Sequence, residues 1–120
     1  MKTLLALSFL VISSFASAAT INNIVGSYKI SNPDFPVLTI VTITANGKVR
    51  LTEQSSYGKL ECSGKAKLKS DILISEVKCE DGQEFTQRIN LKNVKRFSKF
   101  TAPVYSSLYG QEIDMNFEKI

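Results

Sequence analysis

The fold is decided by residues 60–79, which read LECSGKAKLKSDILISEVKC. In the first half of this stretch, apolar or small residues alternate with Lys, Glu and Ser, and such a period of two is typical of a β-strand with one buried face. Ser70-Asp71 fits a two-residue turn that leads into a second strand. If the two strands pair across this turn, Cys62 lies directly opposite Cys79.

A disulfide between these two cysteines is therefore predicted. The pair falls on a non-hydrogen-bonded site of an antiparallel ladder, where Cα atoms lie about 4.5 Å apart, and disulfides bridge Cα separations of about 4.4–6.8 Å. Cys62 and Cys79 are the two cysteines of the chain. An even count in a small exported domain indicates a structural disulfide in preference to two buried free thiols.

Two more hairpins follow from turns that end in glycine, at residues 45–47 (Ala-Asn-Gly) and 80–82 (Glu-Asp-Gly). A three-residue loop at the first turn opposes Ile43 with Val49, whereas a two-residue Asn-Gly turn would oppose Ile43 with Arg50. Only the three-residue loop keeps apolar side chains on one face of the hairpin. The same choice at the second turn also matches its apolar positions.

Similar alternation recurs along the chain and predicts about seven strands in total. Residues 37–44 are apolar on both faces, so we expect either a central strand or one whose outer face is covered. Strands with one polar face must bring their apolar faces together. The sequence therefore predicts an all-β fold, an antiparallel meander of about seven strands closed into a small barrel, with a β-sandwich as the alternative.

The first residues have the layout of a secretory signal peptide, with a positively charged start, an apolar run from Leu4 to Phe15 and a tract of small residues. The run of 12 residues is shorter than the roughly 17–25 that span a bilayer as a helix. We expect cleavage after Ala18 or Ala19.

Residues 1–19 are thus predicted to be a signal peptide, and residues 20–120 a single all-β domain. No cysteine lies near the cleavage site, so a lipoprotein anchor has no acceptor there. The localisation expected for the mature chain is secreted or periplasmic, without a membrane span.

The composition excludes several classes of chemistry. The chain has no histidine, which removes Ser-His-Asp and Cys-His catalysis, His-rich zinc sites and the usual proton shuttle at neutral pH. Glu112 and Asp114 alternate on one strand, where carboxylates are usually solvent contacts. We expect no enzyme, no catalytic residue, no cofactor and no metal site. Without the lysine of the signal peptide the chain has 14 basic and 11 acidic residues, and this mild excess does not indicate a nucleic-acid partner.

Residues 92–110 break the alternation and form the longest irregular stretch of the predicted domain. Tyrosine and serine together suit contact surfaces, because Tyr offers apolar area with a polar tip and Ser adds adaptable hydrogen bonds. The candidate binding loop therefore consists of Tyr105, Ser106, Ser107 and Tyr109. In the alternative interpretation, this stretch caps one end of the barrel through Phe97, Phe100, Val104 and Leu108.

The predicted first strand opens with Gly26-Ser27-Tyr28, which resembles the Gly-x-aromatic start of lipocalin-like and avidin-like (calycin-type) barrels. Tyr28 stands where those families usually carry tryptophan. The resemblance implies a small barrel and the carriage of a small apolar ligand. The residues that would line such a cavity are Tyr28, Phe85, Met115 and Phe117.

Two functions follow as expectations from these patterns. The first is an exported, non-enzymatic binding or interaction module of the cell envelope or exterior, whose partner is an envelope or extracellular protein. The second is a lipocalin-like carrier of a small apolar ligand.

Overall fold

The computed structural model describes residues 20–120, which form one short helix and eight strands. The predicted signal peptide lies outside the described residues. The elements are α2 (Ile21–Ile24), β1 (Gly26–Asn32), β2 (Phe35–Ile43), β3 (Lys48–Ser55), β4 (Gly58–Lys69), β5 (Ile72–Cys79), β6 (Glu84–Asn90), β7 (Lys99–Ser106) and β8 (Gln111–Lys119). Among residues 20–120, no helix has the length and apolar character that crossing a membrane requires.

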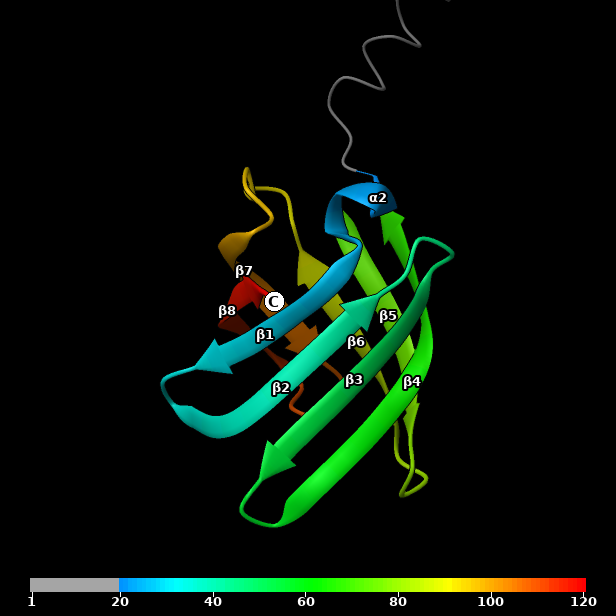
Figure 1. Cartoon of the computed structure of the whole chain (residues 1–120), viewed down its shortest axis with the longest axis vertical. Helices are drawn as coiled ribbons and strands as arrows, with labels where there is room; N and C mark the ends of the chain where they lie inside the picture. The colour runs from blue at the N-terminus through cyan, green and yellow to red at the C-terminus, as the bar shows by residue number, and fades with distance from the viewer. Residues whose placement is uncertain (1–19) are drawn as a thin grey trace, which may run out of the picture.

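The strands pair in sequence order, and β8 also pairs with β1, so the antiparallel sheet closes into a barrel (Figure 1). The predicted all-β barrel is confirmed, and the sandwich alternative is not observed. β2 pairs with β1 and with β3, as expected for a central strand. Its outward Leu38 remains 37% exposed, so this part of its outer face is not covered.

The structure has eight strands where the sequence predicts about seven, and the strand not predicted is β7, which lies inside the stretch expected to be irregular. Its inward positions are Phe100, Ala102, Val104 and the polar Ser106, which weakens the apolar alternation. Pro103 also argues against a strand, because proline cannot donate a ladder hydrogen bond. Pairing of β7 with β6 begins only at Val104, so Pro103 lies outside that ladder.

The three predicted hairpin registers are confirmed. Ile43 pairs with Val49 across residues 45–47, and Val77 pairs with Phe85 across residues 80–82. Gly47 and Gly82 have φ values of 81° and 90°, the left-handed backbone that glycine adopts at little cost. The chain therefore uses one loop type twice.

The predicted disulfide is also confirmed. Cys62 and Cys79 are directly opposite in the β4–β5 ladder and are bonded to each other. Their Cα atoms lie 3.8 Å apart, closer than the distance of about 4.5 Å expected for such a pair. Both side chains are buried, so the bridge belongs to the core. A disulfide of this kind is typical of proteins in oxidising compartments.

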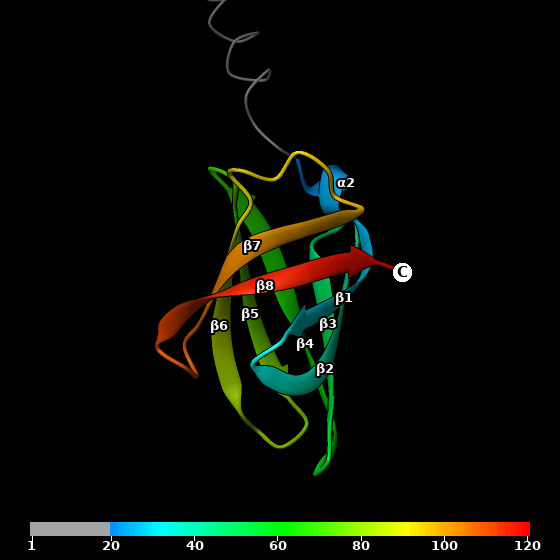
Figure 2. The same cartoon turned by 90° about the vertical axis from the view of Figure 1, so that its left-hand side faces the viewer.

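One end of the barrel, the closed end, is covered by α2 and by the connection between β6 and β7 (Figure 2). Ile24 of α2 and Leu91 of the connection are buried in the core. Phe97 and Phe100 pack against the same core, and the Phe100 ring stacks on Phe117 with centroids 4.6 Å apart. The capping interpretation is thus confirmed for the two phenylalanines.

The other end, the open end, carries the turns β1–β2, β3–β4, β5–β6 and β7–β8. Leu108, which was expected to help cap the barrel, lies in the last of these turns and is 43% exposed. Side chains on the inner side of the strands, together with Tyr109 of the β7–β8 turn, line the interior at this end. Several of them are polar, and they define the site described next.

Candidate functional site

A cavity of about 60 Å³ lies inside the barrel near the open end and is here called the open-end cavity. Its walls come from β1, β2, β3, β6, β7 and β8 and from the β7–β8 turn, since closure of the sheet directs alternate side chains inward. Apolar walls are supplied by Ile30, Val37, Ile89, Val104, Ile113 and Met115, and polar groups by Ser31, Asn32, Thr39, Glu53, Gln87 and Tyr109.

Glu53 is the charged residue of this lining, and it reaches the cavity because its position on β3 continues the inward face of Val49 and Leu51. Thr39 is its partner on β2 and Leu60 its partner on β4. Burial raises the pKa of the Glu53 carboxyl above its ordinary value, because a low-dielectric surrounding disfavours the charged form. The ionised carboxylate is therefore poorly solvated in the free protein.

Tyr109 lies between the cavity that contains this carboxylate and the solvent. It lies in the β7–β8 turn, lines the cavity and is 55% exposed. Burial raises the pKa of its hydroxyl, and the negative charge of Glu53 raises it further. Both residues line the same cavity, so Tyr109 forms part of the rim above Glu53.

We expect Glu53→Gln to change how stability depends on pH. Since the folded pKa of Glu53 lies above the unfolded one, its protonation favours the folded state. This contribution is full below the unfolded pKa of about 4.3 and is lost as pH rises through the folded pKa. Glutamine cannot ionise, so the variant should gain stability relative to the wild type on going from pH 4 to pH 7. Urea unfolding of both proteins at the two pH values measures the change.

The matched control is Glu61→Gln, which removes a carboxylate on the outer face of β4 whose side chain is 45% exposed and which forms an ion pair with Lys59 at 3.4 Å. Exposed pairs contribute little, so its stability should stay within about 0.5 kcal/mol of the wild type. An unchanged pH dependence in Glu53→Gln would contradict the half-buried position of this carboxyl.

The four residues of the predicted binding loop are separated by the structure. Tyr105 and Ser106 belong to strand β7 rather than to a loop, while Ser107 and Tyr109 lie in the β7–β8 turn. Tyr105 faces the outer wall, where the guanidinium carbon of Arg88 lies 5.3 Å from its ring centroid. Only Tyr109 of the four lines the open-end cavity.

The two serines have local structural partners. Ser106 is buried, and its hydroxyl accepts a hydrogen bond from the backbone N–H of Leu108 at 3.3 Å. The Ser107 hydroxyl accepts one from the backbone N–H of Thr86 on β6 at 3.0 Å. The serines therefore hold the turn in place and tie it to β6.

The four residues predicted to line a ligand cavity do not share one. Tyr28 and Phe117 border a space of about 10 Å³ under the closed end, and Met115 lines the open-end cavity. Phe85 is buried in the wall behind an open depression. Sites for small molecules usually measure about 300–1,000 Å³, and both internal cavities are far smaller.

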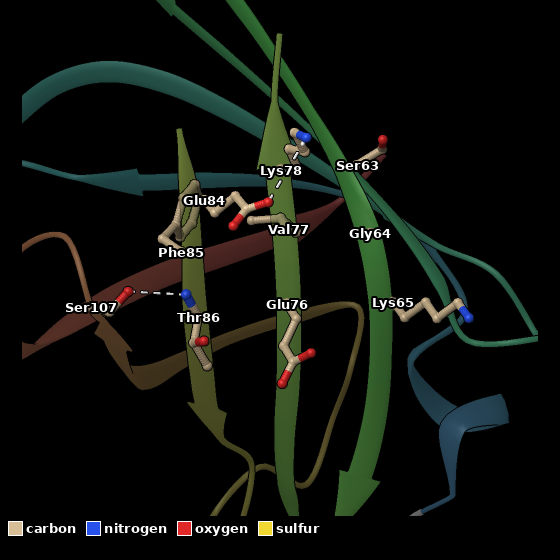
Figure 3. A pocket seen from close by; sticks show the side chains of 10 residues that line it. All are labelled: Ser63, Gly64, Lys65, Glu76, Val77, Lys78, Glu84, Phe85, Thr86 and Ser107. Atoms are coloured by element: carbon tan, nitrogen blue, oxygen red, sulfur yellow. Dashed lines mark hydrogen bonds and ion pairs between the residues drawn. The ribbon is translucent and has the colours of Figure 1, made fainter. Parts of the chain in front are cut away.

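That depression, of about 500 Å³, extends over β4, β5 and β6 (Figure 3). Its charged side chains are Lys65, Glu76, Lys78 and Glu84, two of each sign, and Lys78 pairs with Glu84 at 3.9 Å. A charge-balanced, open surface of this kind offers no enclosed group of polar side chains. Among residues 20–120, no cluster of His, Cys, Asp and Glu could hold a metal ion.

Reasoning from the sequence missed Glu53, although the signal was present. A period of two from Val49 and Leu51 leads to position 53 on the inward face, and a carboxylate there interrupts an apolar pattern. Gln87 gives the same signal between Phe85 and Ile89. Polar residues at inward positions of the strands therefore indicate this cavity.

Comparison of the chain with protein-family models, with curated proteins and with solved structures found no match.

Proposed function

We propose that this protein is an exported, non-enzymatic binding module that contacts an envelope or extracellular protein through the open end of its barrel. The signal-peptide pattern at the start of the sequence and the buried disulfide both support an extracytoplasmic location, secreted or periplasmic. The absence of histidine from the sequence supports a function without general acid–base catalysis of the usual kind.

The observation that carries the proposal is the position of exposed apolar side chains. Five large hydrophobic residues are exposed within residues 20–120, and four of them lie in the turns or strand halves of the open end. They are Leu38, Tyr57, Leu108 and Tyr109. Three of these side chains, those of Tyr57, Leu108 and Tyr109, lie in turns of the open end, and exposed apolar residues at one end of a molecule favour an interaction site there. Tyrosine in particular supplies rigid contact area with a polar tip.

The carrier alternative has less support from the interior. An apolar ligand of ordinary size needs several hundred Å³, whereas the open-end cavity offers about 60 Å³. A co-purifying small mass in native mass spectrometry of the mature protein would nevertheless establish that alternative.

The test compares two surfaces of one hairpin. The tagged mature protein is incubated with extracytoplasmic extract of its own host, and captured proteins are quantified by mass spectrometry. We expect Leu108→Ala with Tyr109→Ala to reduce capture of the partner at least about tenfold, the size of loss typical for truncated interface anchors. Both side chains are exposed, so circular dichroism should show an unchanged fold.

The matched control is Tyr105→Ala, which removes a tyrosine from the outer wall of the same hairpin. It should capture the partner as well as the wild type does. Equal capture by the Leu108/Tyr109 double variant would contradict the proposed surface. Loss of capture only in Tyr105→Ala would move the surface to the outer wall.

A further inference from the structure

The charges of this protein are separated along the barrel axis. Each charged residue is assigned to the turn or strand half on which it lies, and Lys29 falls at the midpoint of β1. The open half then holds nine acidic and two basic residues, a net charge of −7, and the closed half eleven basic and two acidic residues, a net charge of +9. The acidic residues of the open half are Asp34, Glu53, Glu61, Glu76, Glu80, Asp81, Glu84, Glu112 and Asp114.

The two basic residues of the open half each form an ion pair with an acidic residue of the same half. Lys59 pairs with Glu61, and Lys78 pairs with Glu84. A protein that is basic overall thus has an acidic half at the end where the open-end cavity lies. The negative electrostatic potential of this end raises the local concentration of cations and steers basic partners toward it.

The open-end cavity has the size of one side-chain tip. Water occupies about 30 Å³ in the liquid, so about 60 Å³ holds two waters or the end of one long side chain. The cavity combines apolar walls, which suit methylene groups, with the Glu53 carboxylate. Tyr109 at the rim adds an aromatic ring, a surface that attracts cations.

We propose that the open end binds a basic segment of a partner protein and that one lysine side chain of that segment enters the open-end cavity beside the Glu53 carboxylate. This inference rests on the proposed function and names the chemistry of its partner. The apolar walls would cover the lysine methylenes, and the acidic rim would hold the neighbouring basic residues.

Burial supports this choice of occupant. A half-buried carboxylate without full hydration gains more from an incoming cation than an exposed one does. Glu53 lines the cavity and is half-buried, and the same burial raises the pKa of its carboxyl. The ammonium group of lysine is compact and carries three donors, whereas the guanidinium of arginine is a wide planar fork. A narrow cavity therefore favours lysine.

The experiment uses defined probes on the mature, oxidised protein. The first is a short Gly/Ser peptide with three lysines, the second is its counterpart with glutamines, and binding is followed by NMR of the ¹⁵N-labelled protein at low salt. We expect saturable shifts of the amides of Thr39, Glu53 and Tyr109 with the lysine peptide. The glutamine peptide should bind at least about tenfold more weakly.

Glu53→Gln should weaken binding of the lysine peptide at least about tenfold, because a hydrogen bond to a charged group is lost in a partly buried place. The matched control is Glu61→Gln, which removes the same charge from the outer face and should change affinity by less than about threefold. A loss of equal size in both variants would mean a diffuse acidic surface without lysine insertion, and would overturn the proposal.

Other outcomes separate this inference from the proposed function. If Glu53→Gln captures the partner from extract as the wild type does, while the Leu108/Tyr109 double variant does not, the open-end surface stands and the lysine inference is wrong. If the lysine peptide shifts amides of the closed end, or if sedimentation shows that the acidic end binds the basic end of a second copy, the inference is wrong as well.

Discussion

Reduction of the Cys62–Cys79 disulfide is expected to lower the free energy of unfolding by about 3 kcal/mol. The bridge joins residues 17 apart in sequence, and in the chain-entropy model a closed loop of this length restricts the unfolded chain by about that amount. Domains of this size are stable by only about 5–15 kcal/mol. Guanidinium unfolding of the oxidised and the reduced protein, compared at one pH, measures the difference.

Comparison with the reduced wild type isolates the effect of the crosslink on stability, because both sulfur atoms stay in the core. Replacement of Cys62 and Cys79 by alanine together should lower stability further, since it removes buried sulfur as well. A reduced protein within about 1 kcal/mol of the oxidised one would contradict a main role for the bridge in stability.

Gly64→Ala is expected to cost about 3 kcal/mol or to prevent folding altogether. A Cβ atom at this position would lie 1.8 Å from the carbonyl oxygen of Glu76 and 2.9 Å from the Cα of Val77. Both atoms belong to the backbone of β5, so no side chain can rotate away and the two strands must separate. Overpacking of this kind usually costs about 1–3 kcal/mol, sometimes more. Thermal and urea unfolding measure the loss.

The control for this variant is Lys65→Ala, at the next position on β4, where the side chain is exposed. It should change stability by no more than about 0.5 kcal/mol. If Gly64→Ala is tolerated equally well, β4 and β5 do not approach each other as closely as the structure shows.

The hairpin registers could be predicted because three constraints coincide in them. A shift of one residue would turn buried side chains outward, the turns require particular residues, and the two cysteines must meet. We did not predict strand β7 from the sequence, because these three constraints are weak in residues 99–106. Pro103 and the inward Ser106 disturb its pattern, and its ladder with β6 is short.

The candidate site was harder to predict than the fold, since it depends on which strand ends meet in space. Tyr109 was singled out for its composition, but Glu53 is 56 positions earlier in the printed sequence. Only closure of the barrel brings the two around one cavity. Tyr105, chosen on the same grounds as Tyr109, lies on the outer wall, because it alternates with the inward Val104 and Ser106 on β7. Tyr109 lies beyond the end of that strand.

The separation of charge gives the molecule a large electric dipole along the barrel axis. Within about a Debye length of a negatively charged surface, roughly 8 Å at physiological ionic strength, this dipole experiences a torque. The basic closed end turns toward the surface, and the acidic mouth turns away from it. A protein of this kind arrives at an anionic layer already oriented, with Tyr57, Leu108 and Tyr109 facing the surrounding solution.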